Sequence, residues 1–221
     1  MSTRVKICGL RSQATLDAAL DAGADFVGFV LFPKSPRNVA ISDAAALVRH
    51  AKARGGAETV VLLVDPDDAL VERVAKDIAP HRIQLHGHET PERTASVRAL
   101  SGLPVMKAVP VADAEDVAAA RAYLAPERAD ILLFDAKPPR DPAALPGGNG
   151  LAFDWHILGG AERLAPYALA GGLTPENVAA AIRLTGAAIV DVSSGVESRP
   201  GEKDPELIRR FLRAAKAARE A

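Results

Sequence analysis

The chain has 221 residues, of which 48% are hydrophobic, 25% charged and 4% aromatic, and its formal net charge is -1. This length allows a sizeable core, and the balance of 27 basic against 28 acidic residues excludes a sequence-wide basic field for nucleic acid or an anionic membrane. The single cysteine, Cys8, excludes an internal disulfide framework and favours a reducing, cytoplasmic compartment, and the interrupted apolar stretches predict neither a signal peptide nor a transmembrane helix.

Eight short apolar runs alternate along the chain with longer, Ala-rich segments of helical period. The runs predict strands over residues 4–8, 26–32, 59–64, 82–86, 104–109, 130–135, 167–170 and 187–192. The segments between and after them predict helices over 16–23, 43–54, 69–78, 92–100, 114–124, 176–184 and 205–218. Most of the strand runs are continuously apolar, which is typical of strands buried on both faces of a parallel sheet.

Four of the predicted helices have a recognisable start. Asp65-Pro66, Thr90-Pro91, Thr174-Pro175 and Asp204-Pro205 each predict an N-cap followed by proline at the first helical position. Eight strand-helix units of about 28 residues fit a (β/α)8 TIM barrel. The competing architecture, an open doubly wound sheet, normally has a Gly-rich dinucleotide turn after its first strand, and Cys8-Gly9-Leu10-Arg11 is not one.

No linker or low-complexity tract divides the chain, so one barrel domain over residues 1–221 is predicted. The one irregular stretch is the Pro- and Gly-rich segment 136–151. A loop of this length in a compact barrel is usually functional.

Polar residues occur inside the apolar strands. Because side chains alternate across a strand, Lys6 and Cys8 share the face opposite Val5 and Ile7. The polar residues predicted to point into the barrel are Lys6, Cys8, Gln84, His86, Lys107, Asp135 and Asp191. Most of them lie near the carboxyl ends of strands, where barrels of this type have their active sites. For Lys6, Gln84 and Lys107, a satisfied structural network explains the pattern at least as well as a direct role.

Two glycine-containing loops follow the last two predicted strands, Ala170-Gly171-Gly172-Leu173 and Ser193-Ser194-Gly195-Val196. Small residues let backbone N–H groups approach an anion closely, and barrels often bind phosphate with these two loops. The alternative is that glycine only permits tight turns. Two adjacent loops of this kind, the second with two serines, favour phosphate binding.

Several motifs containing these residues follow one another along essentially the whole chain. They are Lys6-Ile7-Cys8-Gly9, Gly28-Phe29-Val30 with Ser35-Pro36-Arg37, Gln84-Leu85-His86-Gly87, Gly147-Gly148-Asn149-Gly150 with Phe153-Asp154-Trp155, the two glycine loops, and Asp191 to Glu197 with Gly201-Glu202-Lys203-Asp204. Together they closely resemble the phosphoribosylanthranilate isomerase family of tryptophan biosynthesis. The resemblance implies a (β/α)8 barrel that converts N-(5-phosphoribosyl)anthranilate into 1-(2-carboxyphenylamino)-1-deoxyribulose 5-phosphate by an Amadori rearrangement, without metal or cofactor.

The resemblance also implies roles for particular residues. Cys8 is expected to be the general base, Asp135 the general acid, and Arg37 the group that binds the anthranilate carboxylate. The residues expected at the phosphate are Gly171, Gly172, Ser193, Ser194 and Gly195, with a contribution from Gly148. Asn149 stands where the family usually has threonine, so a contact of that hydroxyl is not carried over.

Strand order favours the same arrangement. In an eight-stranded ring, strands seven and eight separate Asp135 on strand six from Cys8 on strand one, so a ribose whose phosphate lies on those two loops is placed between an acid and a base. A free thiol titrates near about 8.5 and an aspartic acid near about 3.9, so the site must shift one or both. Lys6 is expected to favour a Cys8 thiolate.

Three other readings of these residues complete the prediction. His86-Gly87-His88 lacks a third ligand and is interpreted as turn chemistry rather than zinc binding. A histidine-pathway aminoaldose isomerase would resemble this chain in its phosphate loops but has aspartate where Cys8 stands. A non-catalytic phosphosugar-binding barrel would not need Cys8, Asp135 and Arg37 together.

The expected partner is a small phosphosugar substrate, not nucleic acid or a membrane. A monomer is the default expectation, because every amphipathic helix is needed to cover the barrel.

Overall fold

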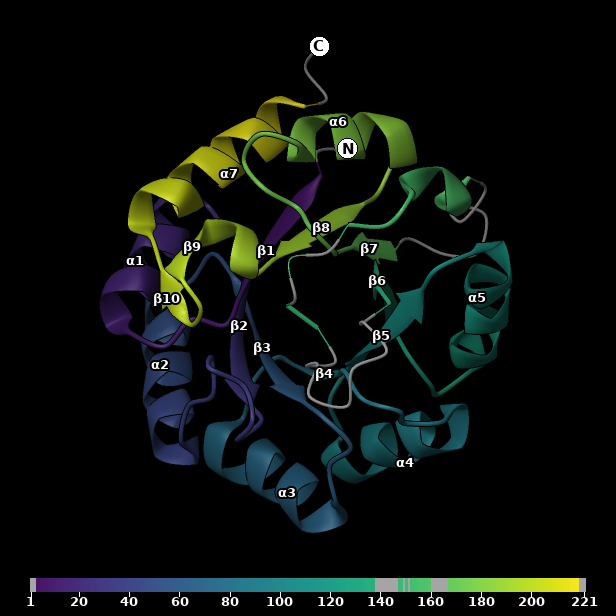
Figure 1. The fold of residues 1–221 in the computed structure, drawn as a ribbon. Helices are drawn as coiled ribbons and strands as arrows, with labels where there is room; N and C mark the ends of the chain where they lie inside the picture. The colour runs from purple at the N-terminus through teal and green to yellow at the C-terminus, as the bar shows by residue number, and fades with distance from the viewer. Residues whose placement is uncertain (1–2, 138–146, 149, 151, 160–166, 219–221) are drawn as a thin grey trace.

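The computed structural model describes residues 3–137, 147–148, 150, 152–159 and 167–218. Eight parallel strands close into a barrel in which β1 pairs with both β2 and β8 (Figure 1). The strands are β1 Arg4–Cys8, β2 Phe26–Leu31, β3 Glu58–Leu63, β4 Arg82–Leu85, β5 Val105–Val111, β6 Ile131–Ala136, β7 Tyr167–Leu169 and β8 Ile189–Val192. The closed ring confirms the predicted (β/α)8 barrel and excludes the open sheet.

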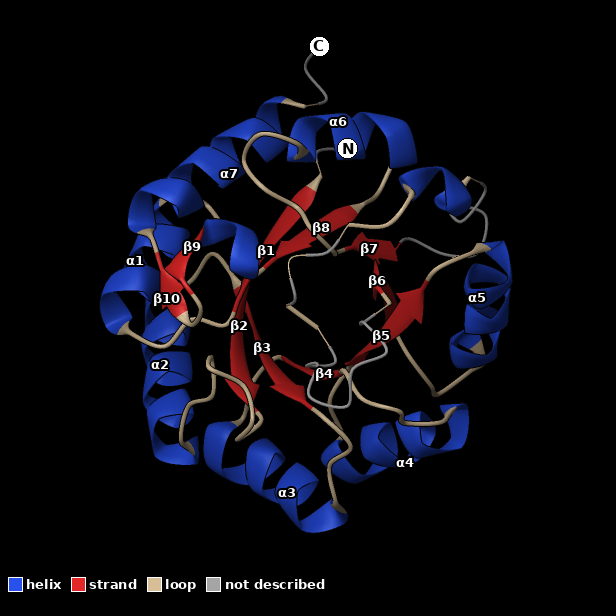
Figure 2. Ribbon diagram, viewed as in Figure 1, coloured by secondary structure: helices blue, strands red, loops and turns tan. Residues whose placement is uncertain are grey.

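Helices form a ring around the strands (Figure 2). They are α1 Gln13–Asp21, α2 Ile41–Arg54, α3 Asp68–Arg73, α4 Pro91–Ser101, α5 Ala114–Ala119, α6 Val178–Thr185 and α7 Pro205–Ala217. Between β6 and β7 the described residues form only the short 3-10 helix η3, Trp155–Leu158, and most of the predicted loop 136–151, including Asn149, lies outside the described residues. Within the described part of the chain, no helix is long and apolar enough to cross a membrane.

Two predicted helices change their winding before they end. After α3 the chain continues as the π-helix η1, Val74–Ile78, because the Ala79 N–H bonds to the Val74 carbonyl five residues back and Ala79 then turns left-handed with φ 50°. After α5 it tightens into the 3-10 helix η2, Ala120–Leu124. Such changes of winding at helix ends leave no distinct signal in the hydrophobic pattern.

The predicted helix starts are confirmed at two of four positions. Thr90 and Asp204 are the N-caps of α4 and α7, and each accepts hydrogen bonds from backbone N–H groups of the first turn. The prediction for Asp65 is wrong, since Asp67 caps α3 while Asp65 has φ 45° and its side chain binds the loop after β4. Thr174 caps only a turn that precedes α6.

Apolar side chains pack in two layers around the strands. One layer lies between strands and helices and includes Val5 and Ile7 of β1. The other side chains alternate with this set and fill the barrel interior, namely Phe26, Val60, Met106, Ala108, Leu133, Ala168, Ala170 and Ile189. The same alternation turns Lys6, Cys8, Gln84, His86, Asp135 and Asp191 inward, as predicted.

Lys107 is the exception to the predicted inward set. Met106 and Ala108 occupy the interior positions of β5, so Lys107 points toward the helices. Its ammonium lies 2.7 Å from the buried Glu89 carboxylate and donates to the Gly87 carbonyl. A buried charge needs such pairing, and the pair ties β5 to the loop after β4. Lys107 therefore has a structural role outside the barrel.

Candidate active site

A pocket lies at the carboxyl ends of the barrel strands and encloses about 800 Å³, part of it open to solvent. This size is ordinary for a site that binds a small molecule. Eight of the nine predicted site residues line the pocket, namely Cys8, Arg37, Asp135, Gly148, Gly171, Gly172, Ser193 and Ser194. The ninth, Gly195, lies behind them, where a Cβ would collide with the carbonyl oxygen of Leu173. Gly195 therefore lets the loops after β7 and β8 pack together.

Cys8 is the last residue of β1 and its side chain is 4% exposed. It pairs with Gly28 of β2, where a Cβ would lie 3.0 Å from the Cys8 sulfur and 3.3 Å from Cε of Lys6. Both distances are tighter than ordinary van der Waals contact. Glycine at this position therefore provides the space in which the thiol and the lysine side chain lie inside the barrel.

The charges around Cys8 act in opposite directions. Burial raises the pKa of the Cys8 thiol, the Lys6 ammonium lowers it, and the Asp191 carboxylate raises it again, so that the pKa lies above its ordinary value. Burial lowers the pKa of Lys6, but Asp191 at 3.0 Å and Cys8 together outweigh burial and raise that pKa, so Lys6 stays charged. Lys6 thus acts on Cys8 in the predicted direction, but burial prevails, and the thiol form of Cys8 is favoured at neutral pH.

Asp135 is the penultimate residue of β6 and lines the same pocket. Its Oδ1 accepts a hydrogen bond from the Ala136 N–H at 2.8 Å, and its Oδ2 lies 3.2 Å from Nε2 of His86. The Gln84 side-chain nitrogen lies 2.9 Å from Nδ1 of the same imidazole. His86 is therefore a pocket residue beside the carboxylate, and its interpretation as turn chemistry is wrong. The sequence pattern already predicted that His86 points into the barrel, because it shares a strand face with Gln84.

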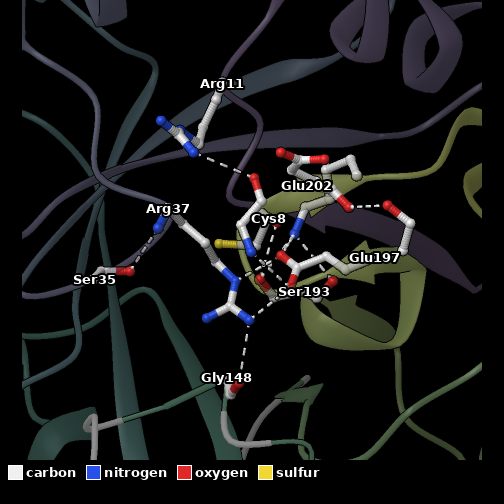
Figure 3. Close-up of polar contacts among 11 residues, drawn as sticks. Cys8, Arg11, Ser35, Arg37, Gly148, Ser193, Glu197 and Glu202 are labelled. Atoms are coloured by element: carbon white, nitrogen blue, oxygen red, sulfur yellow. Dashed lines mark hydrogen bonds and ion pairs between the residues drawn. The ribbon is translucent and has the colours of Figure 1, made fainter.

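Arg37 extends from the loop after β2 and is 5% exposed (Figure 3). Its Nε and Nη2 donate to the two carboxylate oxygens of Glu197 at 2.7 and 2.9 Å, and Nη2 also donates to the Gly148 carbonyl at 3.2 Å. This two-point contact fixes the plane of the guanidinium. Among the described residues, Nη1 has no hydrogen-bond partner, so this end of the group is available to a ligand.

Glu197 belongs to a short hairpin after β8, formed by β9 Glu197–Arg199 and β10 Glu202–Lys203. The Lys203 ammonium donates to Glu197, to the Ser193 carbonyl at 3.0 Å and to the Ser193 hydroxyl at 3.2 Å. The Ser193 hydroxyl in turn donates to the Cys8 carbonyl at 3.1 Å (Figure 3). Ser193 therefore lines the pocket with both its hydroxyl and its carbonyl already engaged.

The loops after β7 and β8 bring backbone close to Asp135. Gly171 has φ 86°, and a Cβ there would lie 2.8 Å from the Ala136 nitrogen and 3.1 Å from Oδ1 of Asp135. A side chain is excluded on both counts. Ser194 opens the short 3-10 helix η5, Ser194–Val196, whose first N–H groups have no acceptor within the helix. These loops line the pocket between Asp135 and Cys8.

Sequence reasoning assigned no role to Glu197 or Lys203, although both lie in motifs that carry the family resemblance. Arg37 and Glu197 are separated by 160 positions. No spacing pattern signals such a pair. The available signal was weaker, namely two charged residues close to the predicted phosphate loop.

Comparisons with known proteins agree on one family. The model of the family described as N-(5'phosphoribosyl)anthranilate (PRA) isomerase matches residues 5–214. N-(5'-phosphoribosyl)anthranilate isomerase of Paracoccus denitrificans is 58% identical over 98% of this chain and 99% of its own, and that of Paramagnetospirillum magneticum is 54% identical over 99% and 100%.

Solved structures give the same result. Phosphoribosyl anthranilate isomerase from Thermotoga maritima matches with a TM-score of 0.85 and 35% identity, covering 97% of this chain and 99% of that chain. A structure of phosphoribosyl anthranilate isomerase in complex with reduced 1-(o-carboxyphenylamino)-1-deoxyribulose 5-phosphate matches with a TM-score of 0.83 and 32% identity over the same shares of the two chains.

Proposed function

The chain belongs to the phosphoribosylanthranilate isomerase family and isomerises N-(5'-phosphoribosyl)anthranilate in tryptophan biosynthesis, and we propose that Cys8 and Asp135 are the general base and the general acid of this reaction. The observation that carries the assignment is their placement in one pocket, at the ends of β1 and β6, on either side of the loops after β7 and β8. The family membership also sets aside the histidine-pathway isomerase and the non-catalytic binding barrel.

In the first step, the Asp135 carboxyl group donates its proton to the ring oxygen of the ribose. The bond between that oxygen and C1 breaks, and the lone pair of the anilino nitrogen forms the C1=N bond of an iminium ion. Asp135 becomes a carboxylate, whose Oδ1 is held by the Ala136 N–H and whose Oδ2 lies beside His86. These contacts stabilise the charge that the acid acquires.

In the second step, the Cys8 thiolate removes the proton from C2. The electron pair of the C2–H bond forms the C1=C2 bond, and the C1=N pair returns to nitrogen, which gives a neutral enolamine. Transfer of the C2 hydroxyl proton to C1 then gives the ketone. Loss of the proton from the Cys8 thiol to solvent and uptake of one by the Asp135 carboxylate restore the starting forms of both groups. Since burial raises the pKa of Cys8, only part of the enzyme holds the thiolate at neutral pH, and Lys6 increases that part.

We assign the two ends of the substrate to opposite parts of the pocket. The phosphate lies on the backbone of Gly171, Gly172, Ser194 and Gly195, with Ser193 contributing its N–H. The anthranilate carboxylate lies at the free Nη1 end of Arg37, beside Gly148. Binding at both ends holds the ribose between the acid and the base, and such orientation is a major contribution to rate.

The activity assay is the direct test of this function. Purified protein is mixed with freshly generated phosphoribosylanthranilate without added metal, and the loss of anthranilate fluorescence is followed. We expect a rate that is proportional to enzyme concentration and far above that in buffer. A rate equal to that in buffer would contradict the proposed function.

Arg37→Lys is expected to raise the KM by about 10- to 100-fold, because the ammonium loses the two-point contact with Glu197 and the planar end that receives the carboxylate. The matched control is Arg213→Lys, an exposed position on the outer helix α7, which should leave the KM unchanged. Steady-state kinetics at substrate concentrations spanning both KM values makes the measurement. An unchanged KM in Arg37→Lys would remove the carboxylate assignment.

The proposal further includes a single-domain monomer in the cytoplasm. The described helices α1 to α7 all contribute buried side chains against the barrel, which supports a monomer. A catalytic Cys8 must remain reduced, which supports a reducing compartment.

A further inference from the structure

Lys203 is a buried lysine that touches no reacting group but contacts both ligand-binding parts of the pocket. We propose that Lys203 is a positioning residue that keeps the Arg37 cluster positively charged for the substrate carboxylate and holds Ser193 at the phosphate loop. The inference rests on the proposed function, because it assumes that Arg37 receives a carboxylate and that the loop after β8 receives a phosphate.

The contacts of Lys203 carry the structural part of the inference. Its side chain is 1% exposed, and its ammonium donates to Glu197, to the Ser193 carbonyl and to the Ser193 hydroxyl. Glu197 holds Arg37, and the Ser193 hydroxyl holds the carbonyl of Cys8. One ammonium group therefore connects the carboxylate end, the phosphate loop and the end of β1.

The charge balance of the cluster explains why a cation is needed there. Glu197 fixes Arg37 but also cancels its charge, so the pair alone is neutral toward an incoming carboxylate. With Lys203 the three groups carry one net positive charge, and the pocket attracts an anion. Without Lys203, the Glu197 carboxylate would oppose the substrate carboxylate at close range. Lys203 is therefore expected to act mainly on substrate binding.

The state of Lys203 depends on pH. Burial lowers the pKa of Lys203 to about 8, a shift that Glu197 opposes and Arg37 increases. The third facing group, Cys8, favours the charged form of Lys203 only when it is a thiolate. A lysine with a lowered pKa is charged below that value and neutral above it. The net charge of the cluster should therefore fall from one to zero as the pH rises through about 8, and substrate binding should weaken in the same range.

The test measures KM and kcat at pH 7 and pH 9 in the wild type, in Lys203→Met and in Lys203→Arg. At pH 7 we expect Lys203→Met to raise KM by about tenfold while kcat falls by less than about threefold. From pH 7 to 9 the wild-type KM should rise several-fold. It should stay flat in Lys203→Met, which has no charge to lose, and in Lys203→Arg, which stays charged.

A double variant separates charge from packing. In Glu197→Gln with Lys203→Met, the glutamine oxygen can still accept from Arg37 and the net charge returns to one, so KM should fall below that of Lys203→Met alone. The matched control is Lys216→Met, whose lysine donates to the Gly23 carbonyl on the outer surface and whose loss should change neither constant.

The outcomes distinguish failure of this inference from failure of the proposed function on which it rests. A wild type without isomerase activity would overturn both. An active wild type whose KM is the same at pH 7 and 9, or a double variant with a KM no lower than that of Lys203→Met, would overturn the inference alone. If Lys203→Met does not fold, the comparison of the wild type with Lys203→Arg across the two pH values still decides the question.

Discussion

Cys8→Ser is expected to lower kcat by about 10³-fold and to change KM by less than about threefold, because a serine hydroxyl is a far weaker base than a thiolate toward the C2 proton. The substitution preserves the shape of the buried side chain, and the substrate contacts assigned to Arg37 and the phosphate loops are untouched. Steady-state fluorescence assays of the two enzymes, with thermal unfolding as a check of the fold, make the comparison.

A deuterium isotope effect tests whether the loss of kcat in Cys8→Ser arises from slower cleavage of the C2–H bond. If Cys8 removes the C2 proton, that step becomes slow in Cys8→Ser, so substrate deuterated at C2 should react more slowly than unlabelled substrate, with a larger ratio than in the wild type. Cys8→Ala serves as the matched control, since it also lacks the base and should behave like the serine enzyme. Turnover near the wild-type value in either variant would remove Cys8 as the base.

The strands were predictable from the sequence because burial on both faces demands an apolar side chain at nearly every position. The first strand matches its predicted bounds, and the others differ by one or two residues at their ends. The error at Asp65 has a different origin. An acidic residue before a proline is a good N-cap signal, but Asp67 lies two residues further on, and only the tertiary contact with the loop after β4 decides between them.

The alternation of side chains carried most of the site prediction, and its one failure is informative. It placed Lys6, Cys8 and Asp191 inside the barrel, where they are found. It failed at Lys107, since a single lysine within an apolar strand does not reveal which face holds its partner, and Glu89 lies on the helix side. Sequence position also could not reveal the contact between His86 and Asp135, which joins β4 to β6 across the barrel mouth.

The contacts that remained hidden are those between loops. Arg37, Glu197 and Lys203 approach one another only because the barrel places the loop after β2 and the hairpin after β8 side by side, on either side of β1. The nearly neutral net charge of the chain gives no hint of this cluster. Only a folded structure shows how the local charges of Arg37, Glu197 and Lys203 add.

Asp135→Asn is expected to lower kcat by about 10²- to 10⁴-fold, because an amide keeps the shape of the side chain but has no acidic proton for the ring oxygen. Its oxygen can still accept from the Ala136 N–H, and its nitrogen can face His86, so the pocket should keep its geometry. Asp154→Asn is the matched control, an exposed aspartate paired with His156, and should leave kcat unchanged.

The isotope effect should respond in the opposite direction to that in the Cys8 variant. Without Asp135, ring opening becomes the slow step, and the C2–H bond is still intact when that step occurs. Deuterium at C2 should then have almost no effect on kcat in Asp135→Asn, whereas it slows Cys8→Ser. The two variants thus lose similar amounts of kcat at two successive steps of the reaction. An enlarged C2 isotope effect in Asp135→Asn would assign Asp135 to proton removal rather than to ring opening.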